Sequence, residues 1–534
     1  MRAGSPSWNR SRADVVTANP WPPADAHHVL VQSGQMASLE ETLFRSGLPV
    51  AALMEKAALA VSRLLLAHGQ QRLARHGAVV LVGPGHNGGD GLVIARELQL
   101  AGIATRLWSP FEQHKPLTES HLNHCLWLGL PRLEQAPDPA GPQLWIDALW
   151  GIGQRRPLPE AIAALLALRQ QLQPGGLVAV DVPSGLCADS GELLGQQAAA
   201  ASHTYCIGLV KQGLVQDAAL PWVGRLERID LGLPATLLET LPAHQPLALW
   251  GSDGASAPWP QLPANAGKYA RGRLLVVAGS DAYRGAARLC LAGARASGAG
   301  SLRAALPKPV AEHLWTLQPE VVLSAALPCH PSGGLDMSAL PATACNRLDA
   351  VVLGPGIGPG PSTWQGLQQL SGLLVLDADG LNRLAQSGSA AAWLQRRSGP
   401  TWITPHRGEF DRLFPELAAR PPLEAAREAA RLTGCSVLLK GAHTLVAAAD
   451  GRLWQIVQSC PAAARAGLGD VLAGLAGGLG AKDLAAGGAA DANLLALAAL
   501  AHAEAGSSDS SGGPMAVAEA LGPMIRIEMA DLNR

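Results

Sequence analysis

One stretch near the end of the chain limits the possible folds more than any other, and it reads RAGLGDVLAGL over residues 465–475. Gly467 and Gly469 stand directly before an apolar run that is typical of a helix. A glycine turn at the positive end of a helix leaves backbone N–H groups free, which favours a bound phosphate. Asp470 is then placed to accept a proton from a hydroxyl that attacks a phosphoryl group. The alternative at this point is an ordinary Asp helix cap.

The composition of the chain is that of a large globular protein. Its 534 residues predict about two to four domains, and 48% of them are apolar while 16% are charged. The formal net charge is −1 with no basic block, so we expect no nucleic-acid partner. No window holds about 18 uninterrupted apolar residues, so we expect no membrane partner. The eight cysteines form no CxxC pair, which favours a reducing, cytoplasmic location.

The domain boundaries follow from changes in composition. Residues 1–35 lack the apolar segment of a signal peptide, and we interpret them as a flexible N-terminal tail. Residues 233–265 carry repeated proline, alanine and serine without a period, and we interpret them as a linker. The sequence therefore predicts one domain over residues 36–232 and a second over residues 266–534.

The first domain begins with a pattern known from nucleotide-binding folds. Residues 36–67 predict helix, broken at Gly47 and Pro49. Residues 78–82 predict a buried strand, which leads into the loop GPGHNGGDG over 83–91 and then a helix over 92–100. A strand, a glycine-rich loop and a helix form the unit that binds phosphates in doubly wound folds. Five glycines within nine residues favour a binding loop over a simple turn.

Oxygen-bearing side chains follow two further predicted strands. Asp147 ends the strand-like run at 144–147, and Asp181 and Ser184 follow the run at 177–180. Because the carboxyl ends of parallel strands face one crevice, these residues and Asn87 are predicted to converge. Such hard oxygen ligands suit an alkali or alkaline-earth cation. The alternative is that each Asp only caps the turn that follows it.

Three strings of this half, GPGHNGGDGLVIAREL, DALWGIG and VAVDVPSGL, resemble the epimerase domain of the NAD(P)H-hydrate repair enzymes over about residues 36–232. The resemblance implies a Rossmann-like three-layer αβα domain that binds hydrated nicotinamide nucleotide. The implied substrate-binding residues are His86, Asn87, Gly88, Gly89 and Asp90, then Gly151, Ile152, Gly153, Gln154, Arg155, Arg156 and Pro157, with Asp181 beside the reacting hydroxyl. The implied potassium ligands are Asn87, Asp147 and Ser184. The family usually has Asn where this chain has His86.

Asp181 is the predicted catalytic residue of this half. Epimerisation at carbon 6 requires the hydroxyl to leave as water, and a positioned carboxyl can donate and then retrieve the proton. From the sequence we expect Asp181→Asn to slow the interconversion of the two epimers while the fold stays intact.

The second half repeats the alternation of strand, loop and helix. Strand-like runs recur at 273–278, 301–306, 320–325, 349–353 and 373–376, with a helix over 285–297. The loops that follow strands read GPGIG at 354–358, DADGL at 377–381, TPHRGEF at 404–410 and KGAHT at 440–444. Singly each has a structural explanation, for example a lysine at a strand end whose ammonium group reaches solvent.

Together with GLGDVLAG, these loops resemble the ADP-dependent NAD(P)H-hydrate dehydratase domain, a ribokinase-like α/β fold, over about residues 265–534. The resemblance implies contacts to the hydrated substrate from Ala286, Gly358, His406 and Asp470. It implies contacts to ADP or AMP from Lys440, Gly441, Ala442, His443, Thr444 and Gly469. The family commonly has a small polar residue where this chain has Leu468. Glu409 is a candidate to organise magnesium, which phosphoryl transfer normally needs.

The sequence thus predicts a bifunctional enzyme that equilibrates the R and S hydrates and dehydrates the S form. Asp470 is the expected base, and ADP is the expected phosphoryl donor, leaving AMP and phosphate. One alternative is a ribokinase-like kinase of a small alcohol or vitamin precursor. Another is an N-terminal half that binds a ligand without catalysis. The sequence leaves homo-oligomer formation open.

Overall fold

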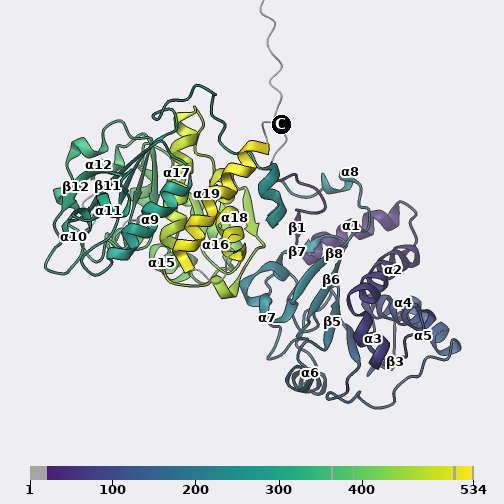
Figure 1. Ribbon diagram of the computed structural model, residues 1–534. Helices are drawn as coiled ribbons and strands as arrows, with labels where there is room; N and C mark the ends of the chain where they lie inside the picture. Colours follow the sequence, from purple (N-terminus) through teal and green to yellow (C-terminus); the bar gives the residue numbers. More distant parts are fainter. Residues whose placement is uncertain (1–20, 362–364, 389, 509–512, 532–534) are drawn as a thin grey trace, which may run out of the picture.

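The computed structural model describes residues 21–361, 365–388, 390–508 and 513–531. They form two α/β domains that lie side by side, and three short elements lie near the place where they meet (Figure 1). These elements are β1 (Leu30–Val31), β7 (Val210–Lys211) and α8 (Ala235–Leu238). The first domain is drawn in purple to blue and the second in green to yellow.

The N-terminal domain is built on a six-stranded parallel sheet with the strand order β3-β2-β4-β5-β6-β8. The strands are β2 (Ala78–Val82), β3 (Thr105–Trp108), β4 (Leu144–Ala148), β5 (Leu177–Val180), β6 (His203–Ile207) and β8 (Arg225–Ile229). The helices are α1 (Ser33–Arg45), α2 (Val50–His68), α3 (Gln70–His76), α4 (His86–Leu100), α5 (Pro116–Trp127), α6 (Glu160–Leu172) and α7 (Leu220–Val223). Apolar side chains of α1, α2, α4 and α5 pack on one face of the sheet and those of α6 on the other. The predicted three-layer α/β domain is confirmed.

The C-terminal domain is built on a ten-stranded sheet with the order β12-β11-β10-β13-β14-β15-β16-β17-β18-β9. Its strands are β9 (Leu247–Leu249), β10 (Arg273–Val277), β11 (Ser301–Pro307), β12 (Val322–Leu327), β13 (Ala350–Leu353), β14 (Leu373–Leu376), β15 (Thr401–Ile403), β16 (Ser436–Leu439), β17 (Leu445–Ala447) and β18 (Leu453–Ile456). All neighbours pair in parallel except β17, which runs antiparallel to β16 and β18. The sheet from β10 to β16 is the predicted parallel α/β core.

Helices cover both faces of this second sheet. One face carries α9 (Arg284–Ala296), α10 (Lys308–Ala311), α11 (Leu314–Leu317), α17 (Leu468–Ala485), α18 (Ala492–Ser508) and α19 (Gly513–Asp531). The other carries α12 (Gln365–Gln368), α13 (Asp379–Gln386), α14 (Ala390–Gln395), α15 (Arg407–Leu413) and α16 (Pro422–Thr433). α17 packs closely on α9, where a Cβ at Gly474 would come within 1.9 Å of the Cys290 carbonyl oxygen. The apolar run after the glycine turn is therefore a buried helix, as predicted.

The predicted tail and linker are more structured than the sequence suggests. Residues 1–20 lie outside the described residues, but β1 pairs with β7, and Trp21 is buried in the core of the C-terminal domain. The predicted linker contains β9, which adds a parallel edge strand to the second sheet. The two segments also meet each other, because the Leu30 N–H donates to the Pro246 carbonyl at 2.9 Å. A three-residue strand in a proline-rich stretch gives too short an apolar pattern to predict.

The first glycine-rich loop is mostly helix. α4 begins at His86, so Asn87 and Asp90 lie in its first turns and not in a loop before it. Here the glycines allow close packing: a Cβ at Gly88 would come within 2.0 Å of the Gly83 carbonyl oxygen. The glycine pattern therefore serves the contact between helix and strand end as well as any ligand.

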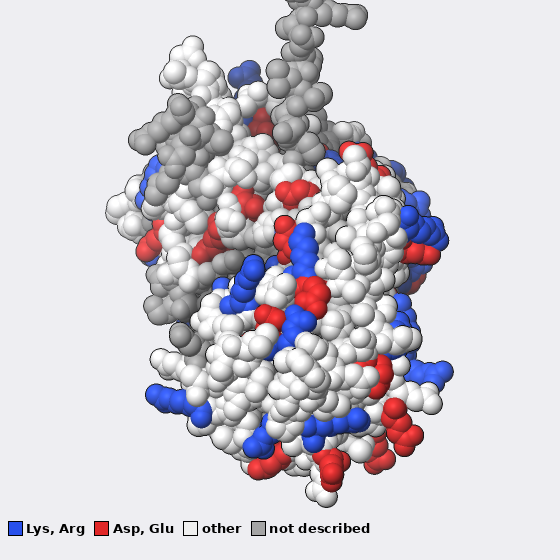
Figure 2. Space-filling model, turned by 90° about the vertical axis from the view of Figure 1, so that its right-hand side faces the viewer, with Lys and Arg blue, Asp and Glu red and all other residues white. Residues whose placement is uncertain are grey.

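The surface agrees with the balanced charge of the sequence. Figure 2 shows acidic and basic side chains interspersed on the face it draws, with no broad area of one sign. Among the helices in the described part of the chain, none has the length and apolar character that a membrane span requires.

Candidate functional site

The predicted loops of the C-terminal domain meet at one edge of its sheet. Each follows the carboxyl end of a parallel strand, at Gly279 after β10, Gly354 after β13, Asp377 after β14, Thr404 after β15 and Lys440 after β16. Backbone hydrogen bonds join neighbouring loops, since the Gly279 N–H donates to the Pro355 carbonyl at 2.8 Å and the Lys440 N–H to the Pro405 carbonyl at 2.8 Å. The sheet thereby gathers these residues in one crevice.

Asp470 lies at the mouth of α17 in this crevice. Gly467 precedes the helix with φ 96°, a left-handed conformation that glycine adopts without strain, and Asp470 is the third residue of the helix. The pKa of Asp470 is raised to about 7, mainly by burial. The negative charge of Asp377 also raises it, and this effect is larger than the lowering by the positive charge of Lys440. A carboxyl group with a pKa near neutrality can exchange protons with a substrate at physiological pH.

Lys440 and Asp377 form an ion pair beside Asp470. The Lys440 Nζ lies 2.5 Å from Asp377 Oδ1, and Thr404 Oγ1 donates to the same oxygen at 2.8 Å. Burial alone would lower the pKa of Lys440, but the charge and hydrogen bond of Asp377, together with the charges of Glu409 and Asp470, outweigh it, so the pKa is raised. The ammonium group also approaches the first turn of α17, because a Cβ at Gly469 would lie 3.1 Å from Nζ. Asp377 was not among the predicted site residues. Its place directly after a strand, as the first residue of DADGL, is the feature that could have identified it.

The predicted substrate contacts Ala286 and Gly358 both lie at the GPGIG loop. The Gly358 N–H donates to Asp379 Oδ2 at 2.8 Å, and these two residues line a cavity of about 490 Å³. Ala286 lies in the first turn of α9, against the GPGIG loop: a Cβ at Gly356 would come within 2.6 Å of the Ala286 Cβ. Asp379 is a second acidic residue that sequence analysis did not name.

His406 and Glu409 form a capping box at the start of α15. The His406 Nδ1 accepts from the Gly408 N–H at 3.0 Å, and Glu409 Oε2 accepts from the His406 N–H at 2.9 Å. The His406 ring remains 56% exposed at the crevice, whereas the Glu409 side chain is 6% exposed. His406 is therefore open to a ligand, while Glu409 already has one carboxylate oxygen engaged by the backbone.

A separate cavity of about 410 Å³ opens beside Lys440 and the start of α17. Five predicted nucleotide contacts line it, namely Lys440, Gly441, Ala442, Thr444 and Gly469, together with Leu468 and His502. The His443 side chain instead contacts the N-terminal domain, where its Nδ1 lies 2.9 Å from the Val215 carbonyl oxygen. Burial lowers the pKa of His502 to about 4, so this ring is neutral.

Asp181 is the centre of the site in the N-terminal domain. It follows β5 with φ 68°, a strained conformation for a side chain other than glycine. Its Oδ1 lies 2.5 Å from the Nζ of Lys211, a residue that is 1% exposed, and backbone N–H groups of Ile152 and Ile207 reach its two oxygens at 3.3 Å each. Burial alone would lower the pKa of Lys211, but the charge of Asp181 and its hydrogen bond, with contributions from Cys206 and Glu40, together raise it by more. Lys211 was not predicted as a site residue, because it lies outside the sequence motifs of this domain.

Two further carboxyl groups surround this ion pair. Burial raises the pKa of Asp90 well above its usual value, and the charges of Asp181 and Glu40 add to the effect. Burial likewise raises the pKa of Glu40 to about 7. The cleft therefore holds carboxyl groups of raised pKa next to an ionic pair, an arrangement in which acid and base roles can be divided.

The three predicted potassium ligands lie near one another along the strand ends. Ser184 Oγ donates to Asp147 Oδ1 at 2.7 Å, and the Ser184 N–H donates to Asp147 Oδ2 at 2.8 Å. The Asn87 carboxamide is buried and neither of its polar atoms has a partner in the described structure, which fits a role in holding a cation or a substrate group. Within the described residues, no group of three or more His, Cys, Asp and Glu is placed to hold a metal ion.

The predicted loop 151–157 borders the same cleft. A Cβ at Gly151 would lie 2.9 Å from Asp181 Oδ2 and 3.5 Å from Asn87. Its residues Gly153, Gln154, Arg155, Arg156 and Pro157 line a cavity of about 360 Å³. Of the predicted residues in α4, the His86 side chain is exposed, while Gly88 and Gly89 are buried. Partial loss of solvent around the ring and the charge of Lys115 lower the pKa of His86.

Two family models match the chain, one for each domain. Residues 50–213 match the model described as YjeF-related protein N-terminus, and residues 274–516 match the model described as NAD(P)H-hydrate dehydratase. Both matches fall within the predicted domains. Among solved structures, an ADP/ATP-dependent NAD(P)H-hydrate dehydratase from Bacillus subtilis is 24% identical, with a TM-score of 0.40 over 52% of this chain and 97% of that one.

Relatives match both domains together. A bifunctional NAD(P)H-hydrate repair enzyme Nnr from Gloeobacter violaceus is 42% identical over 462 residues, which are 84% of this chain and 88% of the relative. One of the same name from Synechocystis sp. is 41% identical over 501 residues, 92% of each chain. The chain therefore belongs to the family of bifunctional NAD(P)H-hydrate repair enzymes.

Proposed function

We propose that the N-terminal domain interconverts the R and S hydrates of NADH and NADPH, and that the C-terminal domain dehydrates the S hydrate with ADP. The observation that carries the proposal is a carboxyl group with a pKa near 7, Asp470, beside Lys440 and the cavity of about 410 Å³. Identity to bifunctional repair enzymes over both domains favours this function over a kinase of a small alcohol or vitamin precursor.

In the C-terminal domain, phosphorylation turns a poor leaving group into a good one. Asp470 accepts the proton of the carbon 6 hydroxyl. At the same time the hydroxyl oxygen attacks the β-phosphorus of ADP, and the P–O bond to AMP breaks. Lys440 and the N–H groups at the start of α17 stabilise the charge on the transferred phosphoryl oxygens. Phosphate then leaves carbon 6 and a proton leaves carbon 5, which forms the ring double bond of NADH or NADPH. Ala286, Gly358 and His406 hold the substrate.

In the N-terminal domain, the C6–O bond breaks and reforms without phosphorylation. The sequence assigns proton donation to Asp181, but this carboxylate already forms an ion pair with Lys211. Asp90, whose pKa is raised by burial, is therefore the proposed donor of a proton to the leaving hydroxyl, while the Asp181–Lys211 pair faces the developing cation. The ring nitrogen's lone pair stabilises that cation. Water then adds to either face and returns the proton. Residues of α4 and of the loop 151–157 hold the nucleotide.

Two metal ions belong to the proposal. Potassium is assigned to Asn87, Asp147 and Ser184, because the unpartnered Asn87 carboxamide and the Asp147 carboxylate offer hard oxygens. When bound, it supplies positive charge near the substrate. Magnesium is assigned to the crevice near Glu409, where it would offset charge on the phosphoryl oxygens. Glu409 fits this role through one carboxylate oxygen only, since the other accepts the His406 N–H.

The location is proposed to be the cytoplasm. All eight cysteines lie in the described part of the chain, and all are free thiols, as a reducing compartment favours.

A single assay tests both activities. We expect an equal mixture of R and S hydrates, supplied with ADP, magnesium and potassium, to be converted completely to the reduced nucleotide. The increase in absorbance of the reduced nicotinamide measures the extent of conversion. A stop near one half would mean that the N-terminal domain does not epimerise, and no conversion would refute the dehydratase. Exchange of potassium for tetramethylammonium should slow only the later part of the conversion, in which the R hydrate must first be epimerised. An unchanged rate in that part would contradict the potassium site.

The raised pKa of Asp470 predicts how dehydration depends on pH. Asp470 acts as a base only when it is deprotonated, and its pKa of about 7 means that this form increases as pH rises through neutrality. We expect kcat/KM for the S hydrate to rise about tenfold from about pH 6 to about pH 8. Initial rates across this range measure the profile. A profile that is flat there, with its inflection near the usual pKa of a carboxyl group, would contradict the role.

A further inference from the structure

Two residues of the N-terminal domain, Val215 and Asp217, contact the KGAHT loop of the C-terminal domain, and Gln216 between them contacts Gln455 of β18. Asp217 Oδ2 accepts from the Ala442 N–H at 2.9 Å, and its Oδ1 accepts from the His443 N–H at 2.8 Å. The Val215 carbonyl lies 2.9 Å from His443 Nδ1. Because a carbonyl only accepts, this ring nitrogen is the donor. The Gln216 Nε2 donates to Gln455 Oε1 at 3.0 Å.

The contacted loop is also a wall of the proposed ADP cavity. Gly441, Ala442 and Thr444 line that cavity, while the buried His443 side chain between them faces the other domain. Gln455 completes the contact, since its Nε2 donates to the His443 carbonyl at 2.8 Å. A Cβ at Gly441 would come within 2.5 Å of Asp217 Oδ2, so the carboxylate lies directly against the loop backbone.

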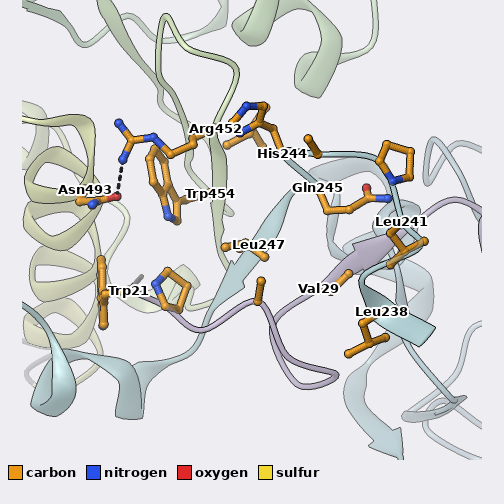
Figure 3. A pocket seen from close by; sticks show the side chains of 15 residues that line it. Trp21, Val29, Leu238, Leu241, His244, Gln245, Leu247, Arg452, Trp454 and Asn493 are labelled. Atoms are coloured by element: carbon orange, nitrogen blue, oxygen red, sulfur yellow. Dashed lines mark hydrogen bonds between the residues drawn. The ribbon is translucent and has the colours of Figure 1, made fainter. Parts of the chain in front are cut away.

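Another part of the contact between the domains surrounds a mainly apolar cavity. This cavity of about 310 Å³ lies where the N-terminal segment, the connector before β9 and the hairpin of β17 and β18 meet. Figure 3 shows the side chains that line it. It is lined mainly by apolar side chains, among them Trp21, Val29, Leu247 and Trp454. The polar contact at residues 215–217 is thus a separate, directional feature and not a continuation of this apolar region.

We propose that residues 215–217 of the N-terminal domain hold the ADP-binding loop of the C-terminal domain in shape, with Asp217 as the positioning residue. The proposal rests on the assignment of ADP to the cavity beside Lys440. A loop held by two charge-assisted hydrogen bonds is ordered before ADP arrives. Without them, ADP must order the loop itself, and that cost reduces its affinity. The dehydratase therefore depends on the attached epimerase domain.

The test compares Asp217→Ala and Asp217→Asn in the full chain. We expect Asp217→Ala to raise the Kd and KM for ADP about tenfold, with kcat at saturating ADP and the KM for the S hydrate within about twofold of wild type. Asp217→Asn keeps one acceptor oxygen and should fall between. Calorimetry gives the Kd, and hydrogen exchange of residues 441–444 should quicken in Asp217→Ala.

Asp25 supplies a matched control. It is also an exposed carboxylate that accepts from two consecutive backbone N–H groups, those of His27 and His28, and it lies beside the apolar cavity away from the loop. Asp25→Ala should leave the Kd for ADP unchanged. An ADP Kd that is unchanged or lower in Asp217→Ala, or one raised equally in Asp25→Ala, overturns the proposal. If the wild type binds ADP but forms no reduced nucleotide, the proposed function fails. The comparison of ADP Kd values still decides whether Asp217 positions the loop.

Discussion

Asp470→Asn is expected to lower the rate of dehydration by about 10²-fold or more. The amide has nearly the shape of the carboxyl group, but it cannot accept the hydroxyl proton as the oxygen attacks phosphorus. In the structure Asp470 stands at the start of α17 with a pKa near 7, beside the Lys440–Asp377 pair. The measurement is the release of reduced nucleotide from pure S hydrate at saturating ADP.

Two controls separate this role from a loss of structure. Epimerisation by the same Asp470→Asn protein should be unchanged, because Asp181 and Lys211 lie in the other domain. Asp483 lies near the other end of α17, where its Oδ2 accepts from the Ala490 N–H at 2.9 Å, and Asp483→Asn should retain dehydration. Dehydration by Asp470→Asn within a few-fold of wild type would rule out Asp470 as the base.

Much of this crevice was predictable because parallel α/β sheets place function at strand ends. The runs at 373–376 and 437–439 are short and wholly apolar, and they are followed by Asp377 and by Lys440-Gly441, which identifies both the strand and its carboxyl end. The run before His406 is shorter, and Thr404 and Pro405 mark its end. The turn before Asp470 was equally clear, since its glycines precede a long apolar helix. The spacing of apolar residues, and the glycine or aspartate residues that end each run, carry this information within about fifteen residues.

Partners that are distant in sequence were not predictable. Lys211 reaches Asp181 across 30 residues and Lys440 reaches Asp377 across 63, and nothing in a local pattern specifies such pairs. The contact of Asp217 with the KGAHT loop spans 225 residues and depends on how two domains lie together. The early start of α4 has another cause: glycines at 88, 89 and 91 disfavour helix locally, but tight packing on β2 and β4 outweighs their low propensity.

The Asp181–Lys211 pair changes what is expected of Asp181→Asn. The sequence alone predicts a slow epimerase with an intact fold, but Lys211 is 1% exposed and would lose its counter-charge. Breaking a buried ion pair by removing one partner typically costs about 3–5 kcal/mol, because the remaining charge stays desolvated. We therefore expect Asp181→Asn to lower the unfolding free energy of the N-terminal domain by about that amount and to slow epimerisation by about 10²-fold.

A second variant separates the two effects. Asp181→Asn combined with Lys211→Met removes both charges, so most of the lost stability should return, while epimerisation stays low because the carboxylate is absent. Denaturant unfolding followed on the N-terminal domain measures the first quantity, and the rate of R to S conversion measures the second. Dehydration of pure S hydrate should be near wild type in both proteins, which shows that the C-terminal domain is folded. Recovery of epimerisation along with stability would mean that Asp181 serves the fold and not the reaction.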